Sequence, residues 1–209
     1  DDRLHLSVDL QGRPLLVDAG RYTYDPGPLR DYFKGPRGHN TVLLDGRATA
    51  LPPRAVGEVP LAVGFRTGVD AASAKASARF EVGGWHTRLV HFERGDGITV
   101  IDETLAFGPH RVTTLWHFHP AVEVRVAGPQ RGGVLVARWP DGRQAWVEPV
   151  ILRGHAVGGW EIALDRGRAG LKPAGWYSPT FNVRQPNWQA TCSIRSHGPL
   201  VVAWRIAGE

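Results

Sequence analysis

The sequence predicts an all-β protein, a large two-sheet antiparallel β-sandwich with few or no helices. Three observations predict it. Apolar and polar residues alternate over residues 4–10, short strand patterns recur as far as residue 206, and turns rich in Gly, Pro and Asp separate them. No segment has the period of a long amphipathic helix, and no internal repeat is visible. We therefore expect a single β-sandwich domain over residues 1–209, a common size for all-β units.

The strand patterns divide into a starting hairpin and a longer series. The hairpin pairs residues 4–10 with residues 15–17 across the turn at residues 11–14. Further strands are expected at residues 42–44, 59–65, 76–82, 85–92, 98–105, 111–119, 121–126, 133–139, 144–150, 160–164, 181–183, 188–194 and 200–206, with turns at residues 45–46, 95–97, 140–142 and 197–199. Residues 19–38 form one long loop rich in Gly, Pro, Tyr and Arg, and loops of that length are usually functional or disordered.

Arginine dominates the basic residues, with 22 Arg against 3 Lys and a net charge of +5. The planar guanidinium binds carboxylate, sulfate and phosphate groups, so a polyanionic partner fits this composition. Biased codon usage on a solvated surface explains it as well, and both interpretations stay open. No basic run or helix indicates a nucleic-acid-binding element, so we expect no nucleic-acid partner.

The ends of the chain and its cysteine say less. No apolar run is long enough to span a membrane, and no signal peptide is visible. A strand pattern begins directly at the first residues without Met, so we expect a piece of a longer protein. Cys192 has no partner for an internal disulfide and is expected to be a small buried apolar residue.

Two pairs of residues are candidates for metal binding. Asp18 ends an apolar strand pattern and His39 begins the next one, so the two side chains converge if these strands are neighbours. Carboxylate and imidazole, with at least one more protein ligand, suit Zn²⁺ or another divalent ion, although Asp18 would also serve as a turn cap. His117 and His119 share one face of a strand, where hydrogen-bonded histidines are more common than metal ligands.

The segments around Asp18 and His39 resemble the C-terminal β domain of the heparinase II/III-like polysaccharide lyases. That family carries an apolar strand ending in Asp-x-Gly-x-Tyr, a variable loop, and a small residue with His-Asn-Thr before a Val-rich strand and Asp-Gly. The same pieces stand in "GRPLLVDAGRYTYD" and "GHNTVLLDG". The segments "DGITVIDET", "HRVTTLWHFHP" and "GWYSPTFNVRQPNWQATCSI" extend the likeness over essentially the whole chain, and the fold it implies is supersandwich-like.

The resemblance implies a metal site. In the family the Asp of the strand and the His of His-Asn-Thr ligate a metal, usually zinc, and they carry over to Asp18 and His39. The metal would have a structural role. A further family ligand, the His of a His-x-Asp motif, falls just before Asp1 in an ungapped alignment, and Asp2 takes the place of the motif's Asp. His5 is the substitute inside the chain, but strand alternation predicts that it is simply exposed.

The resemblance also implies catalytic residues. The family's catalytic Asn or His and Tyr come mostly from an N-terminal helical (α/α) toroid, which we expect elsewhere in the same protein. Some members add a Tyr from the variable loop, so Tyr24 and Tyr32 are the catalytic candidates here, with packing against Trp as the alternative. Tyr22 belongs to the Asp-x-Gly-x-Tyr pattern and has a structural role in this interpretation.

Arginines of the same loop are the candidates for substrate binding. Lyases of this kind neutralise the carboxylate of a uronic acid, and Arg21 and Arg37 are expected to make that contact. Pairing of a loop arginine with Asp25 or Asp31 is the alternative.

The function that follows is that of a polysaccharide lyase C-terminal domain. The parent would cleave acidic, uronic-acid polysaccharides such as glycosaminoglycans or alginate by β-elimination, and would be periplasmic or secreted in a bacterium. This chain would supply metal ligands and part of the substrate cleft, and alone would have little or no activity. A non-catalytic module that binds acidic polysaccharide or has a structural role is the alternative.

Overall fold

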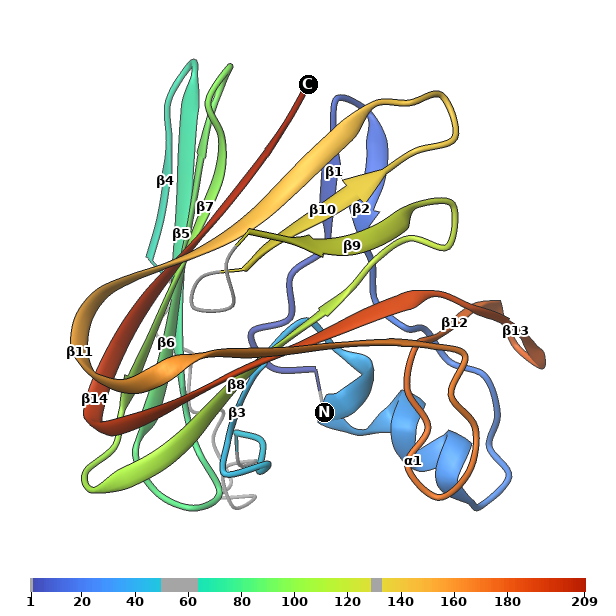
Figure 1. The fold of residues 1–209 in the computed structure, drawn as a ribbon, viewed down its shortest axis with the longest axis horizontal. Helices are drawn as coiled ribbons and strands as arrows, with labels where there is room; N and C mark the ends of the chain where they lie inside the picture. Colours follow the sequence, from blue (N-terminus) through green and yellow to red (C-terminus); the bar gives the residue numbers. More distant parts are fainter. Residues whose placement is uncertain (1, 50–63, 129–132) are drawn as a thin grey trace.

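The computed structural model, which describes residues 2–49, 64–128 and 133–209, confirms a β-sandwich (Figure 1). Its strands are β1 Val8–Leu10, β2 Arg13–Leu16, β3 Val42–Leu44, β4 Gly64–Thr67, β5 Ala71–Arg79, β6 Trp85–Glu93, β7 Gly97–Leu105, β8 Pro109–His117, β9 Glu123–Ala127, β10 Val134–Arg138, β11 Gln144–Arg166, β12 Trp176–Thr180, β13 Val183–Pro186 and β14 Trp188–Gly208. Helix α1, Pro28–Lys34, and the 3₁₀ turn η1, Pro36–Gly38, complete the described elements. None of the described helices has the length and apolar character that crossing a membrane requires.

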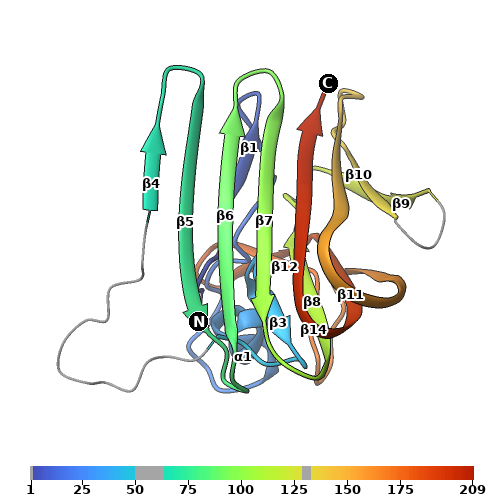
Figure 2. The ribbon, with the colours of Figure 1, turned by 90° about the vertical axis from the view of Figure 1, so that its left-hand side faces the viewer.

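Two very long strands join the two layers of the sandwich. Strands β4, β5, β6, β7, β14 and β11 lie side by side in one layer, which Figure 2 shows face-on. The first half of β14 leaves this layer and pairs with β8, whereas its second half pairs with β7. Strand β11 follows β14 through the same bend, with register shifts between residues 151 and 161. The two layers are therefore one hydrogen-bonded sheet that folds over its own core.

The predicted strand order holds, but several predicted boundaries were wrong. Residues 197–199 are no turn, because β14 runs through them and bends there. Residues 144–150 and 160–164 belong to the single strand β11, and residues 181–183 fall at the turn between β12 and β13. The loop over residues 19–38 contains α1 and η1. The strand expected at residues 59–65 lies mostly outside the described residues.

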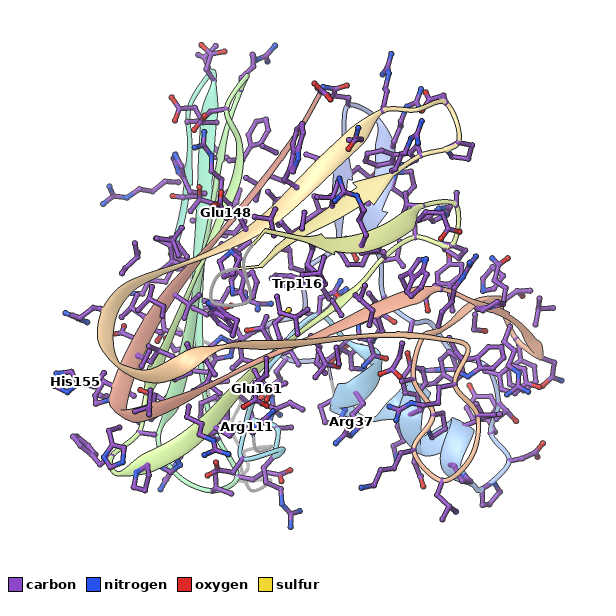
Figure 3. All side chains as sticks on the ribbon, viewed as in Figure 1. Arg37, Arg111, Trp116, Glu148, His155 and Glu161 are labelled. Atoms are coloured by element: carbon purple, nitrogen blue, oxygen red, sulfur yellow. The ribbon has the colours of Figure 1, made fainter. Side chains whose placement is uncertain are left out.

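The core between the layers is built from large aromatic side chains. Trp116 of β8 lies at its centre, edge-on to Trp204 of β14 with ring centroids 5.5 Å apart (Figure 3). Trp160 of β11 packs on the same Trp204 ring at 5.1 Å. Cys192 is fully buried in this cluster, as predicted for a small apolar residue. Burial of such apolar surface is the main favourable term in folding.

A charged group is also buried inside the sandwich. Asp102 of β7 accepts two hydrogen bonds from the Arg88 guanidinium of β6, at 2.8 and 2.9 Å, and one from His86 at 2.8 Å. Arg88 also donates to the backbone carbonyls of Leu4 and Asn40, each at 2.6 Å. Burial alone would raise the pKa of Asp102, but Arg88 and His86 together hold it well below its usual value. The carboxylate therefore stays charged and fully paired.

Removing this buried charge should be costly. Asp102→Asn is expected to lower the free energy of unfolding by about 3–5 kcal/mol, because Arg88 would stay buried without its counter-charge. Asp96→Asn, which breaks the exposed pair with Arg205, is the matched control and should cost less than about 1 kcal/mol. Urea unfolding of both variants measures the difference, and equal costs would contradict the assigned role of Asp102.

The turn after β3 explains the Asp-Gly pair of the sequence motif. Asp45 and Gly46 have φ of 52° and 77°, and Leu44 and Arg47 exchange two backbone hydrogen bonds, which makes a type I′ hairpin turn. The Asp45 carboxylate also reaches β8, where Oδ1 accepts from the Arg111 amide at 2.8 Å and Oδ2 from His110 Nδ1 at 2.7 Å. The turn thus fastens β3 to β8.

The Asp45–His110 contact should be visible as a pH dependence. The hydrogen bond to Asp45 raises the pKa of His110 above its usual 6.5, and the bonds from the Arg111 amide and His110 outweigh burial and lower the pKa of Asp45. The stability that His110 contributes is therefore complete below pH 6.5 and is lost as pH rises through its folded pKa. NMR titration of His110 should give a pKa above 6.5 that falls in Asp45→Asn. An unchanged pKa would contradict the pairing.

Candidate functional site

Strand pairing on β8 brings Asp18 and His39 together. The chain leaving β2 bonds to the end of β8 through the Val17 amide and the His117 carbonyl, at 2.9 Å, while β3 pairs with β8 farther along. The intervening loop closes on itself, with the Ala19 amide donating to the Gly38 carbonyl at 3.1 Å. As a result His39 Nδ1 lies 2.7 Å from Asp18 Oδ2. The predicted convergence of these two side chains is present.

Gly20 explains the glycine two residues after Asp18. Its φ is 86°, and a side chain at this position would collide with the backbone carbonyl of Ser178, where the loop meets β12. The Gly20 amide donates to Asp18 Oδ1 at 2.7 Å. With Oδ1 engaged in this way, Asp18 presents Oδ2 to His39.

Asn40 fixes the backbone around the pair. Its side-chain amide donates to the carbonyls of Leu6 and Val17 at 2.8 and 3.1 Å, and its oxygen accepts the His117 amide at 2.6 Å. Asn40 is completely buried, so water cannot reach its polar atoms. These hydrogen bonds supply the partners that the buried amide group needs. The residue therefore ties the N-terminal segment, the end of β2 and β8 to the position beside His39.

His5 joins Asp18 and His39, contrary to the expectation that it is simply exposed. Regular strand geometry begins only at Val8, and Leu4 has a φ of 57°, so His5 is not bound by strand alternation. Its ring turns inward. His5 Nδ1 lies 3.6 Å from Asp18 Oδ2 and accepts the Asn40 amide at 3.0 Å. Its side chain is only 16% exposed.

The three side chains offer donors of the right type for a metal. One ligand atom from each of His5, Asp18 and His39 lies within 4.8 Å of the others. Two imidazole nitrogens and one carboxylate oxygen form a set that Zn²⁺ accepts, with a further coordination position open. The chemistry of the donor set therefore fits the implied ion. His5 would have to exchange the hydrogen bond from the Asn40 amide for the metal.

Burial and mutual charge set the protonation of this cluster. Burial by itself would raise the pKa of Asp18, but the hydrogen bond and charge of His39, with the Gly20 amide, lower it overall. Burial lowers the pKa of His5, against the opposing charge of Asp18. At neutral pH Asp18 is therefore an anion and His5 a neutral imidazole, the forms that bind metal.

A cavity of about 470 Å³ opens over Asp18 and His39. The residues around it are mostly basic or aromatic: Asp2, Asp18, Gly20, Arg21, Thr23, Tyr24, Arg30, Phe33, Lys34 and His39. The phenol oxygen of Tyr24 accepts a hydrogen bond from Arg21 at 2.7 Å, and the Tyr24 ring is 57% exposed. Arg21 and Tyr24 thus lie together in the lining of the cavity.

The other two predicted residues lie elsewhere. Tyr32 is only 2% exposed, and its hydroxyl lies within hydrogen-bond distance of Gln189 Oε1 and the Trp176 carbonyl. Tyr32 therefore has the packing role that was the alternative to catalysis. Burial also raises the pKa of Tyr32 above its usual value. Arg37 is exposed on η1 beside α1 (Figure 3), and it does not line the cavity.

Arg30 and Lys34 also line the cavity. Arg30 belongs to the loop arginines that were expected to face a substrate, whereas Lys34 was not among the predicted residues. Both lie on α1, one turn apart, which places them on the same face of the helix. Helix α1 begins at Pro28 after Gly27, and Pro at the first position of a helix is the sequence pattern that could have predicted it. His117 and His119 are not members of the His5–Asp18–His39 cluster. Burial lowers the pKa of His117 to about 4, and its Nε2 donates to the Arg37 carbonyl at 2.8 Å.

The family model described as heparinase II/III-like, C-terminal, matches residues 1–205. The chain belongs to this family. Among curated protein sequences, no match was found.

Solved structures of a heparan sulfate lyase and of a heparinase share the fold of this heparinase II/III-like domain. Heparan sulfate lyase HepC from Pedobacter heparinus superposes on 100% of the chain with a TM-score of 0.76 at 14% identity. A structure described as the heparinase III BT4657 gene product covers 100% with a TM-score of 0.73 at 14% identity. The chain covers 31% and 30% of these proteins, so it spans less than a third of their length.

The role of Asn40 in this family domain can be tested by stability. Asn40→Ala should lower the free energy of unfolding by about 3 kcal/mol, because it leaves two partly buried carbonyls and one buried amide without partners. Asn187→Ala is the matched control, since fully buried Asn187 makes one side-chain hydrogen bond, to the Phe118 carbonyl. Chemical unfolding should rank the two losses in that order, and the reverse order would contradict the role given to Asn40.

Proposed function

We propose that this chain is the β-sandwich domain of a polysaccharide lyase that cleaves acidic, uronic-acid polysaccharides by β-elimination. One observation carries the proposal: the Asp18–His39 pair opens on the same cavity as the Arg21–Tyr24 pair. A partly buried carboxylate–imidazole pair, a guanidinium and an exposed phenol thus face one space. Membership of the heparinase II/III-like family supports the reaction class.

The reaction demands two things of the cavity. The C5 proton of a uronic acid is weakly acidic, and negative charge builds up on the adjacent carboxylate as a base removes that proton. The electron pair forms the C4–C5 double bond while the C4–oxygen bond breaks, and the leaving oxygen takes up a proton. The site must therefore neutralise the carboxylate and supply a proton donor.

Arg21 and Tyr24 meet these demands. The Arg21 guanidinium is available to the substrate carboxylate, because its one hydrogen bond within the described residues goes to Tyr24 rather than to a carboxylate. Since the Tyr24 oxygen already accepts from Arg21, its own hydroxyl proton is free to be donated to the leaving oxygen. Arg37, exposed and without a carboxylate partner in the described part of the chain, would contact a substrate that extends beyond the cavity. Tyr32 is not part of this proposal.

A divalent metal, zinc in this proposal, would be held by Asp18 and His39, with His5 as the third ligand. The ion would supply a positive charge that fixes the start of the loop. Asp18 and His39 come from the two ends of the loop over residues 19–38, so their attachment to one point holds Arg21 and Tyr24 in place.

The remainder of the active site would lie in an N-terminal helical toroid of the same protein, which would add the catalytic Asn or His and Tyr. The parent enzyme would be periplasmic or secreted in a bacterium, where acidic polysaccharides are encountered. The polymer would be a glycosaminoglycan or alginate.

Metal content and activity test the proposal together. In the full-length protein, Asp18→Ala and His39→Ala should each abolish stoichiometric zinc and release of unsaturated products, and His5→Ala should weaken zinc binding by at least about 10-fold. The exposed His91→Ala is the matched control and should keep both. Elemental analysis and absorbance of the new double bond are the measurements. Full zinc in all three cluster variants would contradict the metal site.

Binding separates this proposal from a non-catalytic module. If the wild-type protein binds acidic polysaccharides but forms no unsaturated product, the chain belongs to a binding or structural protein. A wild-type protein that forms unsaturated products and loses them in Asp18→Ala supports the lyase.

A further inference from the structure

A second groove lies next to the cavity over Asp18 and His39. It has a volume of about 400 Å³ and is lined by the first half of the long loop, the β12–β13 hairpin and the segment before β12: Tyr22, Thr23, Asp25, Pro26, Gly27, Pro28, Leu29, Arg30, Ala169, Gly170, Pro173, Asn182 and Arg184. Thr23 and Arg30 line both spaces. The groove therefore continues the cavity past the Arg30 side chain.

Arg184 is mounted in this groove on aromatic rings. Its guanidinium carbon lies 4.4 Å from the centre of the Trp176 ring and 5.1 Å from that of Tyr22. Such contacts hold the flat faces of a guanidinium and leave its N–H edges free. Arg30 is placed in the same way, 5.3 Å from the centre of the Tyr24 ring, with one N–H on the Thr23 carbonyl. Both groups are held in position before any ligand arrives.

Neither guanidinium is paired with a carboxylate among the described residues, whereas nine other described arginines are. Arg111, for example, pairs with Glu161 at 2.7 Å between β8 and β11 (Figure 3). Other arginines also pair with carboxylates: Arg13, Arg88, Arg94, Arg143, Arg153, Arg166, Arg168 and Arg205. Arg30 and Arg184 contact aromatic rings instead of carboxylates. Their positive charges therefore remain available to a ligand.

The packing of the loop on the hairpin makes the groove a built feature. The Ser178 amide donates to the Ala19 carbonyl at 2.7 Å, and the Asn182 amide donates to the Tyr22 carbonyl at 2.8 Å. Tyr24 and Phe181 pack across the same junction at 5.3 Å. Asp25 is the acidic member of the lining, and its Oδ2 accepts the Thr23 hydroxyl. Two guanidiniums against this one carboxylate leave the groove with a positive balance.

We propose that this groove is a second subsite for an acidic sugar, with Arg184 as its main anion contact and Arg30 shared with the first cavity. The proposal rests on the proposed function, since it places a neighbouring residue of the same polysaccharide in the groove. Its ligand is the carboxylate or sulfate group of that sugar, which a guanidinium edge binds through paired hydrogen bonds. The Tyr22 and Trp176 rings hold Arg184 and are not themselves the sugar contact.

Size-defined oligosaccharides test this subsite in the full-length protein. Arg184→Gln should raise KM about 10-fold for oligosaccharides long enough to fill both spaces, the loss expected for one charge-assisted contact, while kcat stays within about twofold. The shortest oligosaccharide that is cleaved should keep its KM. Arg184→Lys, which keeps the charge but not the planar fork, should recover part of the loss. Arg125→Gln on β9 removes an exposed arginine elsewhere and is the matched control.

Calorimetric binding of the same oligosaccharides keeps this test separate from the lyase proposal. A protein without elimination activity would refute the proposed function, yet the length-dependent loss of affinity in Arg184→Gln would still support the subsite. Unsulfated and sulfated oligosaccharides distinguish the two anions, because a loss confined to the sulfated series assigns the sulfate group. Arg184→Gln values equal to those of Arg125→Gln at every length, or an equal loss for the shortest ligand, would overturn the subsite.

Discussion

The buried Arg88 guanidinium links the candidate site to the sandwich. It is held by Asp102 on the neighbouring strand and donates to the carbonyls of Leu4 and Asn40. Those two carbonyls belong to the segments that carry His5 and His39. A guanidinium has five donors in a fixed plane, so it can satisfy a carboxylate on one side and two backbone carbonyls on another. The position of the His5–Asp18–His39 cluster relative to the sheet thus depends on one ion pair in the core.

The site is built from segments that are distant in sequence. The loop over residues 19–38 has only two short helical turns of its own. It is fixed at Asp18 and His39, by Asn40 beneath them, and by the β12–β13 hairpin beside it. Aromatic side chains fill the junction and carry arginines on their faces. One packing arrangement therefore orders the loop and presents its positive charge.

The sequence predicted the site in part because of its local chemistry. Asp18 and Gly20 are two residues apart, so the Asx-type contact between the Asp18 carboxylate and the Gly20 amide is encoded locally. Tyr24 and Arg21 are similarly close and remain at the rim. His5 was missed because its exposure was judged from strand alternation, and the strand begins only at Val8. Tyr32 was included because some members of the resembled family use a Tyr from this loop, whereas helix α1 turns Tyr32 into the interior.

By itself the sequence determined the all-β class and the order of the strands, because alternation and turn residues are local properties. The motifs around Asp18 and His39 singled out these two residues, but their contact depends on the pairing of both segments with β8. Only the tertiary structure decided that the two layers are one bent sheet, that His5 completes the cluster and that Arg30 and Arg184 share a groove. Each of these depends on which segments pair across long stretches of chain. The hydrogen-bond registers of β14 with β7 and with β8 are set by packing of the whole core. A local sequence pattern therefore cannot predict them.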